Sequence, residues 1–117
     1  MSGEAWLSPL AALPEVLNAL ILSPDGIPIE TLREAGPPAG ALAAECAALA
    51  QAAAEASGRL SGGRVYRLAL TVDRFALVLL RLERGVAVAV FADRSADLRR
   101  LENEAAGIAT RLAAEVL

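Results

Sequence analysis

Hydrophobic and polar positions along this chain recur with periods that predict groups of strands separated by helices. An apolar run over residues 16–22 is followed by Ser-Pro-Asp-Gly at 23–26 and by a second apolar segment over 27–32. Proline presets φ at the second position of a turn, and glycine accepts the positive φ that closes it. The pattern therefore predicts a hairpin of two strands. Because Pro28 has no N–H to donate, we expect the second strand to lie at a sheet edge.

Three more strands are predicted in the second half of the chain. Residues 64–72 alternate between two faces, whereas 75–82 and 86–92 are apolar on both faces. Short turns at 73–74 and 83–85 join the three segments. Strands that are apolar on both faces are typical of the interior of a sheet that is covered on both sides.

Apolar residues recur at spacings of three and four in three further segments, which predicts three helices. The first spans 2–13 and is ended by Pro14. The second, over 39–57, consists mostly of alanine, and Gly58 is placed to close it. The third begins at Leu98 and continues to the last residue of the sequence as a long amphipathic helix.

The second and third helices each have two distinguishable faces. On the second helix, the face predicted to cover the sheet holds Leu42, Cys46, Leu49, Ala53 and Ala56. Its opposite face holds Glu45, Ala48, Ala52, Glu55 and Arg59, of which the last two can pair at i, i+4. The stripe of the third helix consists of Leu98, Leu101, Ala105, Ile108, Leu112 and Val116. Alanine on the outer face of the second helix would permit close approach by another helix.

The order of elements is helix, two strands, helix, three strands, helix, in one domain over 1–117. This order predicts an α+β sandwich with one five-stranded antiparallel sheet, because the apolar inner strands need helices on both faces. We expect the central helix to cover one face of the sheet and the terminal helices to cover the other.

The composition excludes several kinds of chemistry. The chain has no histidine and a single cysteine, Cys46, so zinc sites, Ser-His or Cys-His pairs and disulfides are not expected. It also has no lysine, and therefore no phosphate-binding loop of the Gly-x-x-x-x-Gly-Lys type. Cys46 is interpreted as a small buried hydrophobic residue. We expect no catalytic residue, no metal and no cofactor.

Charge and hydropathy limit the partners. A net charge of -3 argues against nucleic acid, which favours a basic surface. The first residues, Met-Ser-Gly-Glu-Ala-Trp-Leu, lack a basic start followed by a long apolar run, and the later apolar runs are the length of strands. The expectation is a soluble cytoplasmic protein without membrane contact.

Several strings in this order resemble the Roadblock family, the dynein light-chain and GTPase-regulator domain related to the longin and profilin-like folds. The resemblance rests on the hairpin over 20–29, the alanine-rich helix over 39–57, and the segment 86–101, in which a strand leads through Asp93 into the last helix. It covers about Leu13 to Leu112. What the resemblance implies for the fold is the same helix and strand order that the hydrophobic pattern predicts.

The resemblance also implies a dimer in which the third strand pairs antiparallel with its copy and the two central helices lie side by side. The residues agree with this, because 65–71 contain no proline and no lysine that would block pairing at an edge. The predicted dimer interface consists of Val65, Tyr66, Arg67, Leu68, Ala69, Leu70, Glu45, Ala48 and Ala52.

Members of such families hold or regulate small Ras-like GTPases, so the leading hypothesis is a non-enzymatic dimeric regulator or scaffold of such a GTPase. Glu55, Arg59 and Arg64 are the candidate partner-binding residues. Two alternatives stay open: a small-ligand sensor with a pocket between helix and sheet, and a pure oligomerisation module. An enzyme is the weakest hypothesis, since Asp25, Asp73 and Asp93 fall at predicted turns or helix caps.

Overall fold

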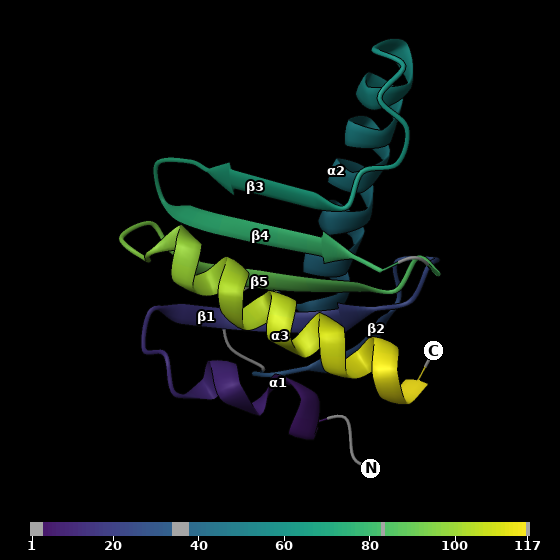
Figure 1. Ribbon diagram of the computed structural model, residues 1–117. Helices are drawn as coiled ribbons and strands as arrows, with labels where there is room; N and C mark the ends of the chain where they lie inside the picture. The colour runs from purple at the N-terminus through teal and green to yellow at the C-terminus, as the bar shows by residue number, and fades with distance from the viewer. Residues whose placement is uncertain (1–3, 34–37, 83, 117) are drawn as a thin grey trace.

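The helices and strands follow the predicted order in the computed structural model, which describes residues 4–33, 38–82 and 84–116 (Figure 1). Each predicted element is present, with boundaries that differ by a few residues at some ends. The elements are α1 (Glu4–Ala11), β1 (Val16–Leu22), β2 (Pro28–Thr31), α2 (Ala39–Arg59), β3 (Arg67–Thr71), β4 (Phe75–Arg81), β5 (Ala87–Asp93) and α3 (Leu98–Val116).

The strands form one five-stranded sheet in the order β2-β1-β5-β4-β3, and every neighbouring pair is antiparallel. The predicted sheet is confirmed. As Pro28 indicated, β2 lies at one edge. The two segments that are apolar on both faces, β4 and β5, lie inside the sheet, where both of their faces are covered. The strand β3 occupies the other edge.

The turn between β1 and β2 forms as its residues predict. The N–H of Gly26 donates to the carbonyl of Ser23 over 2.9 Å, and Gly26 has φ of 81°. A Cβ at this position would lie 2.9 Å from the Cβ of Ala47, so glycine also lets the turn approach α2 closely.

Two apolar clusters lie on opposite faces of the sheet. Alternate residues of β4 show the division: Val78 and Leu80 pack with α1 and α3, whereas Leu77 and Leu79 pack with α2. The terminal helices thus share one face and the central helix covers the other, which confirms the predicted layers (Figure 1). Trp6 of α1 is partly buried against the first cluster.

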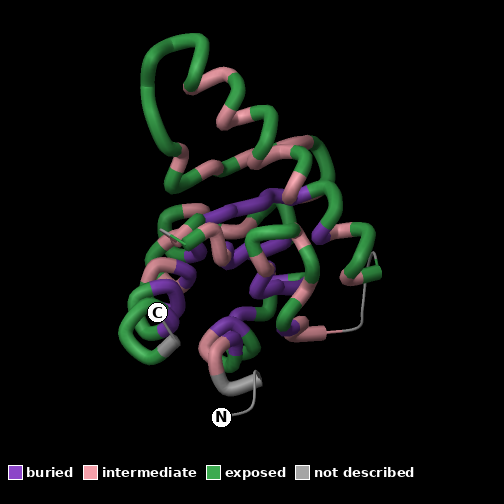
Figure 2. Tube along the Cα trace, turned by 90° about the vertical axis from the view of Figure 1, so that its right-hand side faces the viewer, coloured by how far each residue is buried: buried purple, intermediate pink, exposed green. Residues whose placement is uncertain are grey.

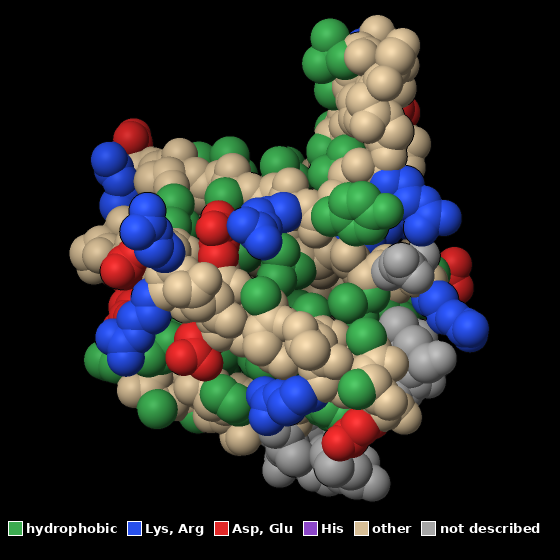
Figure 3. Space-filling view, viewed as in Figure 1, with side chains coloured by type: hydrophobic (Ala, Val, Ile, Leu, Met, Phe, Trp, Pro, Cys, Tyr) green, Lys and Arg blue, Asp and Glu red, His purple; other side chains and the backbone are tan. Residues whose placement is uncertain are grey.

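The helix α3 has the predicted amphipathic character. Leu101, Ala105, Ile108 and Leu112 are buried. Its N-terminus is capped by Asp97, whose carboxylate accepts hydrogen bonds from the backbone N–H groups of Arg99 and Arg100 at 3.0 and 3.4 Å. Acidic and basic side chains intermingle on the face of the molecule that α3 covers (Figure 3).

Several predicted boundaries differ from the observed ones. The first helix ends at Ala11 instead of residue 13, β4 ends one residue earlier than predicted, and β5 is shifted by one residue. The second strand is shorter than 27–32, and the third begins at Arg67 instead of residue 64. The helix α2 continues through Gly58 to Arg59 and ends where Ser61 takes φ of 57° and the N–H of Gly62 donates to the carbonyl of Ser57 over 2.8 Å. The positive φ that ends the helix comes three residues after Gly58, and residues 64–66, which were predicted to be strand, lie in the irregular connector.

A few predictions fall outside the described residues. These are the start of the first helix at Ser2, Glu83 in the last turn, the side chain of Val116 in the stripe of α3, and the end of that helix at Leu117. Within the described parts of the chain, no helix combines the length and the apolar character that crossing a membrane would require.

Candidate functional site

The edge strand β3 presents unpaired backbone groups to the outside of the sheet. The N–H of Arg81 donates to the carbonyl of Tyr66 over 2.9 Å, and the N–H of Val72 donates to the carbonyl of Phe75 over 3.0 Å. In an antiparallel pair these bonds recur at every second residue, so the even-numbered residues of β3 bond to β4. The N–H and C=O groups of Arg67, Ala69 and Thr71 therefore point outward.

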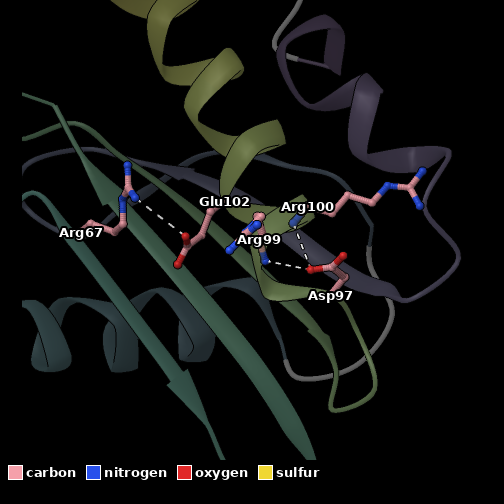
Figure 4. A network of polar contacts seen from close by, with 5 residues as sticks. All are labelled: Arg67, Asp97, Arg99, Arg100 and Glu102. Atoms are coloured by element: carbon pink, nitrogen blue, oxygen red, sulfur yellow. Dashed lines mark hydrogen bonds and ion pairs between the residues drawn. The ribbon is translucent and has the colours of Figure 1, made fainter.

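The side chains of β3 alternate between the two faces of the sheet, as predicted. Leu68 and Leu70 are half-buried against the cluster that α2 covers. Arg67, Ala69 and Thr71 are exposed on the other face. Arg67 reaches across that face to α3, where its guanidinium lies 3.7 Å from the carboxylate of Glu102 (Figure 4). This ion pair fixes the direction of Arg67 but is too exposed to add much stability.

Two predicted interface residues, Val65 and Tyr66, lie in the irregular connector before β3 and not in the strand. Tyr66 is 54% exposed, while its carbonyl keeps the bond to β4. The regular part of the edge is therefore the short stretch from Arg67 to Thr71.

The helix α2 projects beyond this edge. It extends past β3, and its second half stands clear of the sheet (Figures 1 and 2). Among the residues of α2, all of which the structure describes, only Ala43 and Cys46 are buried, both in the first half. Ala53 and Ala56, which were predicted to cover the sheet, are only half-buried, because the sheet ends before the helix does. The sheet does not reach this half of the helix, but the connector that follows it packs on one side, where the hydroxyl of Ser57 donates to the carbonyl of Gly63 over 2.6 Å.

The outer face of α2 is exposed as predicted. Glu45, Ala48 and Ala52 form a shallow, mostly small-residue surface on it. Glu55 accepts a hydrogen bond from the side-chain amide of Gln51 over 3.2 Å. The side chain of Glu55 is thus directed toward Gln51, one turn earlier, and the pairing expected with Arg59 is replaced by this contact.

The candidate partner-binding residues lie in two places. Glu55 and Arg59 belong to the projecting half of α2, whereas Arg64 lies in the exposed connector that returns from this helix to β3. The predicted dimer and partner residues lie along α2, the connector and the edge of β3, and we call this region the open edge. Val65, Leu68 and Leu70 are half-buried there, and the other predicted residues are exposed.

The described residues contain no cluster of metal-ligating side chains. Cys46 is buried on the face of α2 that packs on the sheet. Burial, with a smaller contribution from the nearby Glu45 carboxylate, raises the pKa of its thiol to about 11. The thiol is therefore neutral at ordinary pH and behaves as the small hydrophobic residue that was predicted. Hydrogen bonds from the hydroxyl and backbone N–H of Ser95 lower the pKa of Asp93, which closes a local turn.

Sequence reasoning missed a buried polar contact at the opposite edge. The side chain of Asn18 in β1 accepts from the N–H of Arg33 over 2.9 Å and donates to the carbonyl of Arg33 over 2.8 Å. The Arg33 guanidinium in turn donates to the carbonyls of Val16 and Ala11. A single polar residue within an apolar strand was the available signal, since such a residue needs partners when buried.

A second missed contact joins the same edge to the first helix. Glu30 of β2 is buried, and its carboxylate accepts a hydrogen bond from the N–H of Leu7 over 3.2 Å. It thereby satisfies a backbone donor in the first turns of α1.

The fold is an α+β sandwich with helices on both faces of the sheet. One edge of the sheet is β2, which contains Pro28 and which we call the closed edge, and the other is β3. The model of the Roadblock/LC7 domain matches residues 3–92. The chain therefore belongs to the Roadblock/LC7 domain family, which confirms the family that the sequence resembled. No curated protein matches the chain significantly.

Solved structures agree with this assignment. A Roadblock/LC7 domain from Streptomyces avermitilis superposes with a TM-score of 0.85 at 26% identity, over 97% of this chain and 96% of that one. The gliding protein MglB from Thermus thermophilus gives a TM-score of 0.81 at 17% identity, over 99% and 95% of the two chains. An MglB described with a tetrameric arrangement gives 0.83 at 17% identity, over 97% and 90%.

Proposed function

We propose that the protein is a cytoplasmic, non-enzymatic homodimer that regulates or scaffolds a small Ras-like GTPase. The observation that carries the proposal is the open edge, where the unpaired backbone groups of β3 lie beside a helix whose outer face is exposed. A second copy supplies both missing partners at once. Its β3 extends the sheet to ten strands, and its α2 packs against the small residues Ala48 and Ala52.

The outward backbone groups of β3 and its side chains favour one register for pairing with the β3 strand of a second copy. Pairing centred on Ala69 places Arg67 opposite Thr71 of the second copy and lets all outward groups of β3 bond. Pairing centred on Arg67 would place two arginines opposite each other, which is unfavourable in a cross-strand pair. On the α2 face, the first register also brings Leu68 next to Leu70 of the second copy.

The GTPase would bind the exposed platform formed by the paired α2 helices and the connectors beside them. Glu55, Arg59 and Arg64 are the charged residues offered there. We favour repositioning of the GTPase's own switch loops, which needs no catalytic residue from this chain. Insertion of an arginine into the GTPase site is the second mechanism, and it would require a single arginine whose loss removes stimulation.

Binding to GTPases loaded with different nucleotides tests this proposal. Ras-like GTPases from the source genome are loaded with GDP or with a slowly hydrolysed GTP analogue and titrated with the protein. Binding at least tenfold tighter in one nucleotide state supports a regulator, and equal binding supports a scaffold. If no such GTPase binds in either state while the dimer persists, the proposal is wrong and the open edge serves oligomerisation alone.

A charge exchange sharpens the assignment of the platform. Arg59→Glu should weaken GTPase binding about tenfold or more while leaving the dimer intact, because Arg59 lies beyond the predicted helix contact. Arg111→Glu on the exposed side of α3 is the matched control and should leave binding unchanged.

A further inference from the structure

Two adjoining hollows lie on the α2 face of the sheet, where the β1–β2 turn, the β4–β5 turn and the connector before β3 meet. The first has a volume of about 180 Å³ and the second about 340 Å³. They share part of their lining, namely Pro24, Val65, Tyr66, Arg81 and Gly85. The two hollows therefore form one continuous depression, which we call the paired hollow.

The first hollow is apolar at its inner end. Leu22, Leu68 and Leu79 rise from the sheet, and Ala50 and Cys46 face them from α2. An apolar cavity of about 150 Å³ is large enough to hold benzene. The first hollow thus has room for an apolar group of about six carbons, which the small side chains of the alanine-rich helix leave unfilled.

The second hollow is basic. Its charged lining residues are Arg64, Arg81 and Arg84, and the described lining contains no acidic residue. This concentration of positive charge stands out in a protein with a net charge of -3. Arg81 lines both hollows, and neither it nor Arg84 forms an ion pair with another described residue. Asp25, at the outer rim of the first hollow, is the acidic residue that lines this site.

The walls of the paired hollow are held in place by close contacts at two glycines. A Cβ on Gly85 would lie 3.0 Å from the Cβ of Pro24, and one on Gly26 would lie 2.9 Å from the Cβ of Ala47. The β4–β5 turn is thereby packed on the β1–β2 turn, which is packed on α2. Both glycines have positive φ, so other residues would be strained there. The depression is accordingly a preformed feature of the fold.

We propose that the paired hollow binds a small organic anion, with an apolar body of about six carbons in the first hollow and an anionic oxygen group at Arg81 in the second. An apolar pocket with a few convergent polar groups is the usual form of a small-molecule site. Guanidinium groups bind carboxylate and phosphate oxygens through paired N–H donors. The paired hollow shares Arg64 with the candidate partner-binding residues, and Val65, Tyr66 and Leu68 with the predicted dimer interface. The binding test below uses this protein alone, so its result does not depend on a GTPase.

Titration of the full chain, followed by amide chemical shifts, tests the proposal with defined probes. Hexanoate and hexyl phosphate carry the two anionic groups on the same apolar body, and 1-hexanol is the neutral match. The proposal predicts saturable shifts at Asp25, Ala50, Tyr66 and Gly85 with at least one anion, and binding of hexanol at least about tenfold weaker. The anion that binds with the lower dissociation constant shows whether the site prefers a carboxylate or a phosphate.

Two variants separate the basic and apolar parts. Arg81→Gln should weaken anion binding about tenfold, and Ala50→Leu should abolish it by filling the first hollow. The matched controls Arg111→Gln and Ala114→Leu, both on the exposed side of α3, should leave binding unchanged. The proposal is overturned if neither anion gives saturable shifts, if hexanol binds as tightly, or if Arg81→Gln binds as well as the parent protein.

Discussion

The two edges of the sheet differ in everything that controls strand pairing. At one edge, β2 has four residues, contains Pro28, and shifts register against β1 between Ile21 and Leu22. At the other, β3 has five residues, contains no proline, and keeps an unbroken register with β4. Proline and register irregularities are common means of closing an edge to further strands. One sheet thus has a closed edge and an open edge, set by a few residues.

The closed edge is also tied to the rest of the chain. Asn18 and Arg33 fasten the segment after β2 to β1, and Glu30 fastens β2 to α1. Among the described residues, the polar side-chain contact that joins β3 to the rest of the fold is the exposed ion pair between Arg67 and Glu102. The fold therefore stabilises the edge that it closes, whereas the other edge keeps unpaired backbone groups.

Proline at the open edge should give the largest effect on association. Ala69→Pro removes an outward N–H and no bond to β4, so it should raise the dimer dissociation constant at least about 100-fold while the fold persists. Thr31→Pro makes the corresponding change at the closed edge, because the N–H of Leu32 already bonds to the carbonyl of Ala19 and Thr31 points outward. Sedimentation equilibrium of both variants measures the effect. An unchanged dimer in Ala69→Pro would mean that another surface associates.

Removing the side-chain hydrogen bonds of Asn18 near the closed edge should strongly reduce the free energy of unfolding. Asn18→Leu leaves the buried N–H of Ala19 and the part-buried N–H and C=O of Arg33 without their side-chain partner, so the free energy of unfolding should fall by about 3 kcal/mol. Denaturant unfolding measures the change. Asn103→Leu on the exposed side of α3 is the control and should stay within about 0.5 kcal/mol. Equal effects of the two substitutions would contradict the role given to Asn18.

High pH should destabilise the side of the sheet that α2 covers. The pKa of the Cys46 thiol rises from its usual 9.0 to about 11 in the folded protein. Below pH 9 the thiol is protonated in the folded and the unfolded state, so its contribution to the free energy of unfolding is fully present. As the pH rises from 9 to 11, the thiol of the unfolded state loses its proton first. The free energy of unfolding should then fall by up to about 2.5 kcal/mol. Cys46→Ala, followed over the same pH range by urea unfolding, should lack this component, and a parallel decline would contradict it.

The ion pair between Arg67 and Glu102 at the open edge should contribute least to the free energy of unfolding. Arg67→Gln removes an ion pair in which the arginine side chain is 59% exposed, so the free energy of unfolding should change by less than about 0.5 kcal/mol. Thermal unfolding at low and high salt measures this. A loss of more than about 1 kcal/mol would show that the open edge is fastened as firmly as the closed one.

The sequence predicted the features that depend on local chemistry. The turn at 23–26, the edge position of Pro28 and the two apolar inner strands follow from residue types and spacing, and all were confirmed. The family was also correct. The interface residues remain predictions, and the structure shows only that they lie together along the open edge.

Features that depend on distant contacts could not be predicted in the same way. The partners of Asn18 and Glu30 are 15 and 23 residues away in the chain, so no local pattern reveals them. The helix α2 projects past the sheet because its length exceeds the width it covers, and that width is set by tertiary packing. The paired hollow likewise arises where two turns meet α2, and no single segment encodes it.

Amide hydrogen exchange at two backbone positions tests the central claim, that a second copy pairs with the open edge, most directly. The N–H groups of Ala69 and Thr31 both point outward from a single copy, so one spectrum contains the site and its control. At concentrations where the protein is dimeric, exchange at Ala69 should be at least about 100-fold slower than at Thr31, and dilution to monomer should remove the difference. Equally fast exchange at both positions in the dimer would contradict the account.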